Sequence, residues 1–278
     1  MDADLVAVLR CPVCGDALAL TDRTARCPQG HAYDLAKQGY LNLLPSASTG
    51  IEGDSAGMIG ARTVFLGTGH YAPIRDALIL AAAGLRDDDL IVEVGAGTAY
   101  YLSGVLGAAV NRRGIALDVS KYAARRAAKV DPRIGSVVCD AWHDLPVQDN
   151  AAGLMLNVFA PRNAAEMARV LAPDGSLLVV TPNQQHLAEL IGALGLVTVD
   201  EEKERRLQES FAGAFVQTGS EVIEETLRLG RSDVEQLVLM TPSARHLNYR
   251  ELAQELAVLQ EPAIVTLSVT LSTWRTAG

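Results

Sequence analysis

The 278-residue chain has few cysteines, few aromatic residues and no long apolar run. No stretch approaches the ~18 apolar residues of a membrane-spanning helix, so a membrane protein is not expected. Aromatic residues make up only 5 % of the chain, so the core must consist mainly of Ala, Val and Leu. The acidic N-terminus lacks the pattern of a secretion signal, which favours a cytoplasmic protein with reduced thiols. Of four cysteines, Cys139 stands apart and is expected to be a small core residue.

The chain also has fewer basic than acidic residues, with 24 Lys and Arg against 33 Asp and Glu, and its net charge is −9. This balance argues against a protein that coats nucleic acid, because such binding depends on neutralising phosphates. It still allows a local basic surface. The clearest basic run is Lys121, Arg125, Arg126, Lys129 and Arg133, and runs of this kind are more often solvated faces than RNA-binding ones.

The other three cysteines lie near the N-terminus and are followed by a histidine. Cys11 and Cys14 form a Cys-x-x-Cys pair, and Cys27 and His31 form a second close pair. Two such pairs can fill the tetrahedral shell of a structural Zn²⁺, leaving no open position for catalysis. The alternative is three buried free thiols beside an unrelated histidine. The spacing favours zinc, so we predict a zinc-binding lobe over residues 1–45.

The rest of the chain alternates between short apolar segments and helical ones. We predict a linker and helical connector over residues 46–84, and a main domain over residues 85–278. Strands are predicted within residues 89–97, 113–120, 134–141, 151–161 and 176–182, with helices within residues 100–110, 121–130, 162–175 and 186–195. This order predicts an α/β fold with a doubly wound, mostly parallel sheet and helices on both faces.

The first strand of this alternation ends in a glycine turn, EVGAGT, which begins at Glu93. Gly95 and Gly97 let the backbone turn sharply and approach a ligand at the carboxyl edge of the sheet. A dinucleotide site would have a small residue three positions after Gly97, where this chain has Tyr100. The bulk there favours S-adenosylmethionine, so Glu93, Gly95 and Gly97 are candidate cofactor-binding residues.

Three polar residues end the next strands. Asp118 closes the second strand, where a carboxylate can bind both ribose hydroxyls, although it could instead cap the next helix. Asp140 closes the third strand and could accept a hydrogen bond from the adenine amino group. Asn157 ends the fourth strand, facing the transferred methyl group, where it could orient a polar nucleophile or satisfy a local turn.

These features together resemble the 23S ribosomal RNA guanine-N1 methyltransferases, some of which confer macrolide resistance on antibiotic producers. The resemblance covers almost the whole chain, through the zinc pattern, GDSAGMIGARTVFLGTGHY, the glycine turn with its paired tyrosines, LDVSK, FAP, ARVLAPDG and TPNQQHL. It implies a zinc lobe joined to a class I S-adenosylmethionine-dependent methyltransferase domain. It also implies a hairpin-loop guanine as substrate and a possible homodimer. The implied cofactor contacts are Tyr71, Gly97, Thr98 and His186.

Methylation of guanine N1 requires removal of its proton, which a carboxylate or histidine within hydrogen-bond reach could accept. A donor near O6 would stabilise the developing charge. We predict Asp54 as the base and Arg62 or Asn157 as the O6 partner, since Asp54 and Arg62 lie in the run between lobe and cofactor domain. The alternative roles are a helix N-cap and a surface salt bridge.

Two other functions fit the same residues. A methyltransferase acting on a small molecule would explain why acidic residues outnumber basic ones in the zinc lobe. An S-adenosylmethionine-binding module without turnover fits less well, because the glycine turn and Asp118 are intact.

Overall fold

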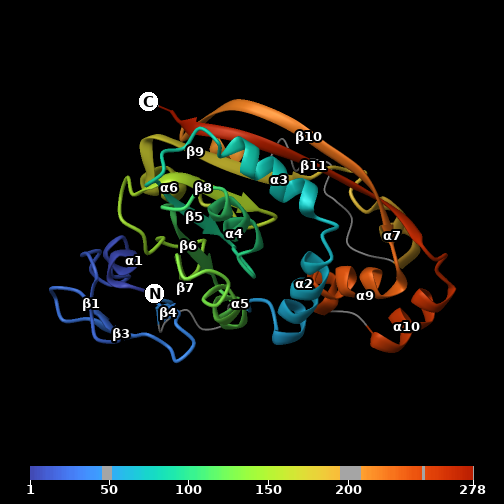
Figure 1. Ribbon diagram of the computed structural model, residues 1–278, viewed down its shortest axis with the longest axis horizontal. Coiled ribbons are helices and arrows are strands. Elements are labelled where there is room, and N and C mark those ends of the chain that lie inside the picture. The colour runs from blue at the N-terminus through green and yellow to red at the C-terminus, as the bar shows by residue number, and fades with distance from the viewer. Residues whose placement is uncertain (46–51, 195–207, 246–247, 278) are drawn as a thin grey trace.

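The computed structural model describes residues 1–45, 52–194, 208–245 and 248–277 (Figure 1). Its centre is an eight-stranded sheet in the order β10-β11-β9-β8-β5-β6-β7-β4. The strands are β4 Leu41–Asn42, β5 Leu90–Val94, β6 Arg113–Asp118, β7 Ile134–Val138, β8 Ala152–Val158, β9 Leu171–Pro182, β10 Phe215–Leu229 and β11 Ala263–Thr276. The neighbouring strands β9, β8, β5, β6, β7 and β4 run parallel to one another. Strand β11 runs antiparallel to both β9 and β10. The predicted doubly wound, mostly parallel sheet is confirmed.

Both faces of the sheet are buried, which explains the nearly continuous apolar strands. Along β8, Leu154 and Leu156 enter the core beneath α3 and α4, while Met155 enters the core beneath α1 and α6. Cys139 is buried on the second face, as expected for a small core residue. The helices are α1 Ala3–Ala7, α2 Ala56–Gly67, α3 Ala72–Ala81, α4 Tyr100–Gly107, α5 Lys121–Ala127, α6 Ala164–Val170, α7 Ala188–Leu194, α9 Arg231–Leu239 and α10 Tyr249–Val258, with a 3-10 turn η1 at Pro242–Arg245.

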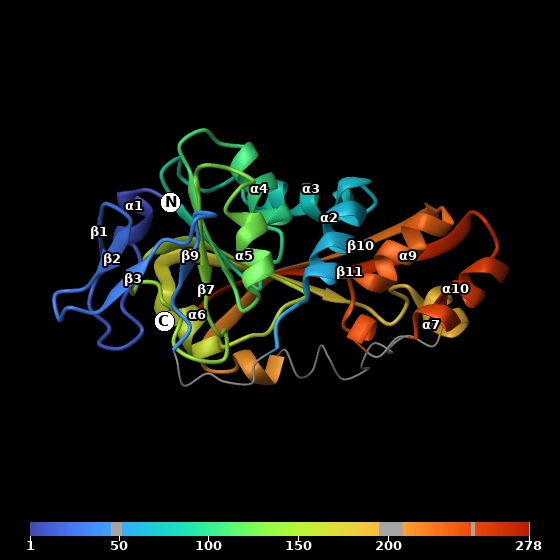
Figure 2. The ribbon, with the colours of Figure 1, turned by 90° about the horizontal axis from the view of Figure 1, so that it is seen from below.

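The N-terminal lobe combines α1 with a small antiparallel sheet of β1 Ala19–Thr21, β2 Thr24–Arg26 and β3 Ala32–Asp34. It shares a core with the main sheet, because Leu5 and Val6 of α1 lie in one hydrophobic cluster with Val92. Near the end of the range predicted as the lobe, β4 pairs with β7 at the edge of the main sheet. Figure 2 shows the lobe at one end of the molecule and α7, α9 and α10 at the other.

The predicted linker at residues 46–51 falls outside the described residues. The helical connector is present as two helices, α2 and α3. Ser55 caps α2 by accepting a hydrogen bond from the Met58 amide, and Gly69 has a left-handed φ of +85° in the bend before α3. Within the described ranges, no helix is long and apolar enough to cross a membrane.

Candidate active site and metal centre

The four predicted metal ligands converge in the lobe, with their ligand atoms all within 4.8 Å of one another. His31 Nδ1 lies 3.5 Å from Cys11 Sγ and 3.3 Å from Cys27 Sγ, and Cys14 Sγ lies 3.6 Å from Cys27 Sγ. Three thiols and one imidazole at this spacing fit Zn²⁺ and fill a tetrahedral shell, so the site is structural. The Tyr33 hydroxyl, which sequence reasoning missed, lies 3.3 Å from Cys11 Sγ and can donate to that ligand.

The glycine turn follows β5 and is tightly enclosed. Gly95 and Gly97 have left-handed φ values of +70° and +53°. A Cβ on Gly95 would collide with Ala160, and one on Gly97 would lie 2.8 Å from Arg62 Nη1. Both positions therefore favour glycine for its conformation, and Gly95 also for space. Thr98 is buried directly after the turn.

Asp118 holds the glycine turn to the end of β6. Its Oδ2 accepts a hydrogen bond from the Gly97 amide, and its Oδ1 accepts one from the Ser120 amide, both at 2.8 Å. Burial raises the pKa of Asp118, although these two hydrogen bonds act in the opposite direction. Ser120, rather than Asp118, caps α5, so the alternative role as a helix cap is not observed. A ribose contact by Asp118 stays a prediction.

Glu93 lies beneath the turn and is fully buried. Its Oε2 accepts a hydrogen bond from the Leu102 amide of α4 at 3.2 Å. Burial, together with the nearby charge of Asp118, raises the pKa of Glu93 to about 8. This geometry makes Glu93 a support that joins β5 to α4. Its predicted contact with the cofactor stays a prediction.

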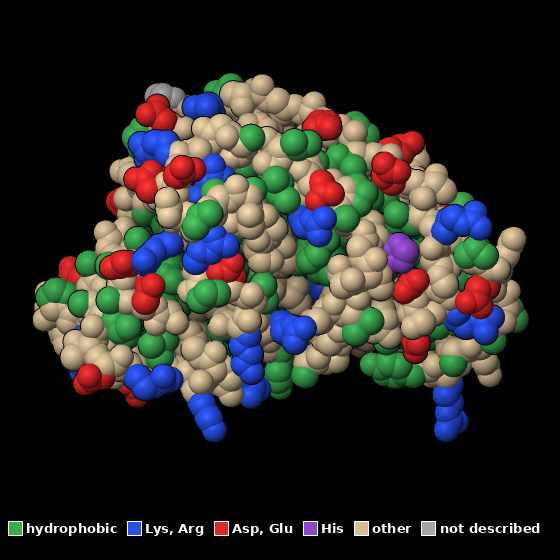
Figure 3. Space-filling model, viewed as in Figure 1, with side chains coloured by type: hydrophobic (Ala, Val, Ile, Leu, Met, Phe, Trp, Pro, Cys, Tyr) green, Lys and Arg blue, Asp and Glu red, His purple; other side chains and the backbone are tan. Residues whose placement is uncertain are grey.

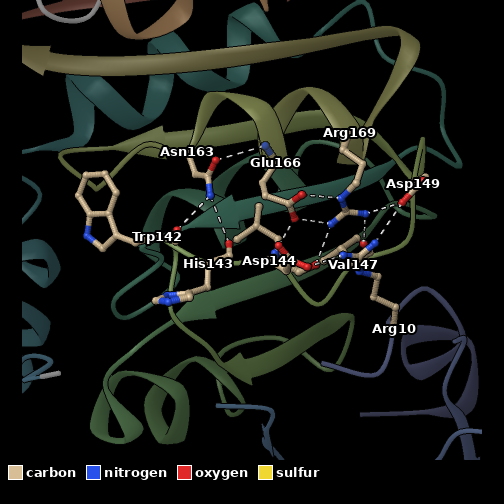
Figure 4. Close-up of polar contacts among 10 residues, drawn as sticks. Arg10, Trp142, His143, Asp144, Val147, Asp149, Asn163, Glu166 and Arg169 are labelled. Atoms are coloured by element: carbon tan, nitrogen blue, oxygen red, sulfur yellow. Dashed lines mark hydrogen bonds and ion pairs between the residues drawn. The ribbon is translucent and has the colours of Figure 1, made fainter. Parts of the chain in front are cut away.

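Asp140 follows β7, and both of its carboxylate oxygens form hydrogen bonds with residues of the same loop. Oδ1 accepts from the Trp142 amide at 3.0 Å, and Oδ2 pairs with His143 Nδ1 at 2.7 Å. Asn163 donates to the carbonyls of Trp142 and His143, which joins this loop to the start of α6 (Figure 4). The adenine contact of Asp140 stays a prediction.

Tyr71 and His186, which only the resemblance implied as cofactor contacts, come together from distant parts of the chain. The Tyr71 hydroxyl lies 3.4 Å from His186 Nε2, and both residues are buried. The Ser268 amide donates to His186 Nδ1, so a neutral imidazole carries its proton on Nε2, facing Tyr71. Burial raises the pKa of Tyr71. A solvated position for His186 at a helix start is therefore wrong.

Asp54 and Arg62 form an ion pair with Oδ2 and Nη2 2.8 Å apart, and each side chain is about three-quarters buried. Arg62 also donates to the Met240 carbonyl, and the Asp54 carbonyl accepts from Ser120 Oγ. Because Ser55 caps α2, a capping role for Asp54 is not observed. The pair adjoins the glycine turn through the contact of Arg62 with the turn.

Asn157, the third predicted catalytic residue, has no accessible surface. Its Nδ2 donates to the Pro161 carbonyl at 2.8 Å, and its Oδ1 accepts from Arg162 Nε at 3.3 Å. The side chain closes the loop after β8, so the local-turn alternative is observed. Its role as an O6 partner stays a prediction.

A doubly wound sheet with a glycine turn after β5 and an acidic residue after β6, joined to a zinc ribbon, defines a class I methyltransferase with an N-terminal zinc module. Residues 9–48 match the zinc-ribbon family described as RlmA, N-terminal, and residues 92–179 match the methyltransferase domain family. A candidate methyltransferase structure from Bacillus halodurans shares the fold, with a TM-score of 0.51 at 13 % identity over 72 % of this chain and 97 % of that one.

Two relatives match along the whole chain. The 23S rRNA (guanine(748)-N(1))-methyltransferase of Streptomyces fradiae is 46 % identical over 99 % of both chains. A candidate 23S rRNA (guanine-N(1)-)-methyltransferase of Micromonospora griseorubida is 45 % identical, also over 99 % of both chains. The chain belongs to the 23S rRNA (guanine-N1)-methyltransferase family.

Proposed function

We propose that this protein transfers a methyl group from S-adenosylmethionine to N1 of a guanine in a hairpin loop of 23S rRNA. The observation that carries the proposal is that the zinc ligands, the glycine turn and the Tyr71–His186 pair are assembled in one chain. Its relatives named for guanine-N1 methylation match it from end to end.

A basic surface suited to RNA lies on α5, despite the negative net charge. Lys121, Arg125, Arg126 and Lys129 are exposed there, and within the described part of the chain they form no ion pair. Figure 3 shows Lys and Arg side chains at the lower centre of the molecule, where Figure 1 places α5. Arg133 differs, because it pairs with Asp131 and supports the loop before β6. Unpaired cations of this kind can contact phosphates.

The chain's own residues account for substrate alignment and proton removal. When bound, S-adenosylmethionine supplies a methyl group on a sulfonium, and the sulfur keeps the bonding electrons as the new C–N1 bond forms. Asp54 accepts the N1 proton, and Arg62 donates to O6 as negative charge develops there. The ion pair holds Asp54 beside Arg62, whose guanidinium lies against Gly97 of the glycine turn. The proposed cofactor contacts remain Tyr71, Glu93, Gly95, Gly97, Thr98, Asp118, Asp140 and His186.

The test is methylation of unmodified 23S rRNA with tritiated S-adenosylmethionine, followed by primer extension. We expect label at one hairpin-loop guanine and a stop in reverse transcription there, because N1 methylation blocks base pairing. No incorporation by a protein that still binds the cofactor in calorimetry would contradict the proposal. It would instead favour a small-molecule acceptor.

A further inference from the structure

The loop after β8 holds an aromatic residue in a costly conformation. Phe159 has a φ of +53°, in the left-handed region that bulky residues rarely adopt. Its amide donates to the Val180 carbonyl, and the Asn157 side chain fixes the end of the loop. Ala160 packs directly on Gly95 of the glycine turn. Such a conformation persists only where the surroundings impose it, and it is typical of functional sites.

The Phe159 ring is supported on one side and open on the other. It stacks on His186 with centroids 5.8 Å apart and planes 27° apart, and the Tyr71 ring lies 6.4 Å away. Even so, 39 % of Phe159 stays exposed. The loop therefore presents a fixed aromatic surface beside the glycine turn and beside the proposed cofactor contacts.

We propose that Phe159 is the surface on which the target guanine stacks, which places N1 against the donor methyl group. The inference rests on the proposed function and adds a substrate-binding residue to it. An unpaired purine turned out of a hairpin loop is recognised mainly by stacking on aromatic side chains, and a ring already fixed in place loses little entropy on binding. The left-handed backbone conformation of Phe159 serves this role, because it leaves part of the side chain exposed.

The experiment compares Phe159→Leu with Phe159→Tyr in the full-length protein. Leucine keeps apolar cover over His186 but lacks an aromatic face, whereas tyrosine keeps that face. We expect Phe159→Leu to lose roughly 10- to 100-fold in kcat/KM on the hairpin RNA, while Phe159→Tyr stays within a few-fold of the original protein. The cofactor Kd, measured by calorimetry, should stay within twofold for both variants. Trp142→Ala, which removes another exposed aromatic residue, serves as the control for general loss of RNA contacts.

A binding cycle separates stacking from indirect effects. The original protein and Phe159→Leu are titrated with the hairpin and with the same hairpin made abasic at the labelled guanine. We expect the leucine variant to bind the intact hairpin more weakly and the abasic hairpin equally well. An equal loss on both RNAs, or a loss explained by weaker cofactor binding, would overturn the stacking role. Failure of the unaltered protein to methylate the hairpin would instead refute the proposed function, and Phe159 would lose its role with it.

Discussion

Arg10 and Arg169 share one carboxylate oxygen, Asp149 Oδ1, at 3.5 and 2.6 Å (Figure 4). Arg10 stands next to the zinc ligand Cys11, whereas Arg169 lies in α6 of the methyltransferase domain. Arg10 also pairs with Asp144, in the loop that begins after Asp140. This network links the metal site to the loop proposed to face the adenine.

The two arginines should differ in their effect on stability. Arg169 donates to Glu166 and to the carbonyls of Leu145 and Val147, so Arg169→Ala removes an ion pair and several partly buried hydrogen bonds at once. We expect it to lower the free energy of unfolding by about 2–4 kcal/mol. The Arg10 side chain pairs with two exposed carboxylates, those of Asp144 and Asp149, so Arg10→Ala should cost about 0.5–1 kcal/mol. Urea unfolding of both variants measures the difference, and equal losses would contradict this division.

The metal should be integral to the lobe. We expect one zinc per chain by elemental analysis, and a drop in Tm when a chelator removes it, because a four-ligand zinc site contributes folding energy directly. Cys27→Ser should abolish stoichiometric zinc. Cys139→Ala provides the matched control, since it removes a buried thiol outside the ligand set and should leave one zinc bound. Full zinc content in the Cys27 variant would refute the ligand assignment.

Glu93 should make stability depend on pH in a defined direction. Its pKa of about 8 in the folded protein exceeds the value of about 4.3 expected when unfolded, because burial disfavours the charged form. The folded state therefore keeps a proton that the unfolded state releases. The stabilisation from this group is complete below pH ~4.3 and is lost as pH rises through 8. Between these values the free energy of unfolding falls with a limiting slope of about 1.4 kcal/mol per pH unit.

Glu93→Gln removes this titration and keeps the size of the side chain. Unfolding free energies of both proteins, measured from pH 5 to pH 9, should diverge, with the original protein losing stability relative to the variant as pH rises. Parallel curves would show that the Glu93 carboxyl ionises normally in the fold.

The α5 surface should control salt-dependent RNA binding. Replacing both Arg125 and Arg126 with Glu removes two exposed cations from one helix face. We expect weaker hairpin binding and a shallower dependence of log Kd on log salt, by about one to two units of slope. Arg228→Glu, an exposed charge change on β10 at the far edge of the sheet, should leave both values unchanged. Equal effects of the two changes would show that only total charge matters.

If Asp54 is the base, its substitution should slow methyl transfer without weakening cofactor binding. Asp54→Asn keeps the size of the side chain but cannot accept the N1 proton. We expect kcat to fall at least about 100-fold, with partial recovery at higher pH, where solvent removes more of that proton. The cofactor Kd should change less than twofold. Glu52→Gln is the matched control, because Glu52 lies in the same segment and pairs with Arg245 at the surface. Normal turnover by Asp54→Asn would exclude it as the base.

The sequence was informative wherever a feature depended on neighbours in the chain. The spacing of Cys11, Cys14, Cys27 and His31 defines a ligand set by itself. The apolar segments of the domain predict strands because they are short and alternate with helical segments. The glycine turn carries its own conformational requirement in Gly95 and Gly97.

Features that depend on packing between distant segments could not be read from the sequence. Asn157 and Phe159 lie in one short loop, yet the first is buried in hydrogen bonds and the second is partly exposed in a left-handed conformation. Only the approach of Ala160 to Gly95 and of Phe159 to Val180 sets that outcome. A partly exposed phenylalanine in FAP has no distinctive sequence pattern that would mark it.

The two-residue pairing of β4 with β7 has a consequence for how this architecture can be rearranged. Leu41 and Asn42 complete the backbone hydrogen bonding of Val137 and Val138, and Leu5 and Val6 cover apolar residues of the same sheet. A zinc lobe transplanted from a relative would have to bring a matching strand edge and a matching apolar face. A hybrid cut at the linker whose lobe lacked these features would expose both surfaces to water.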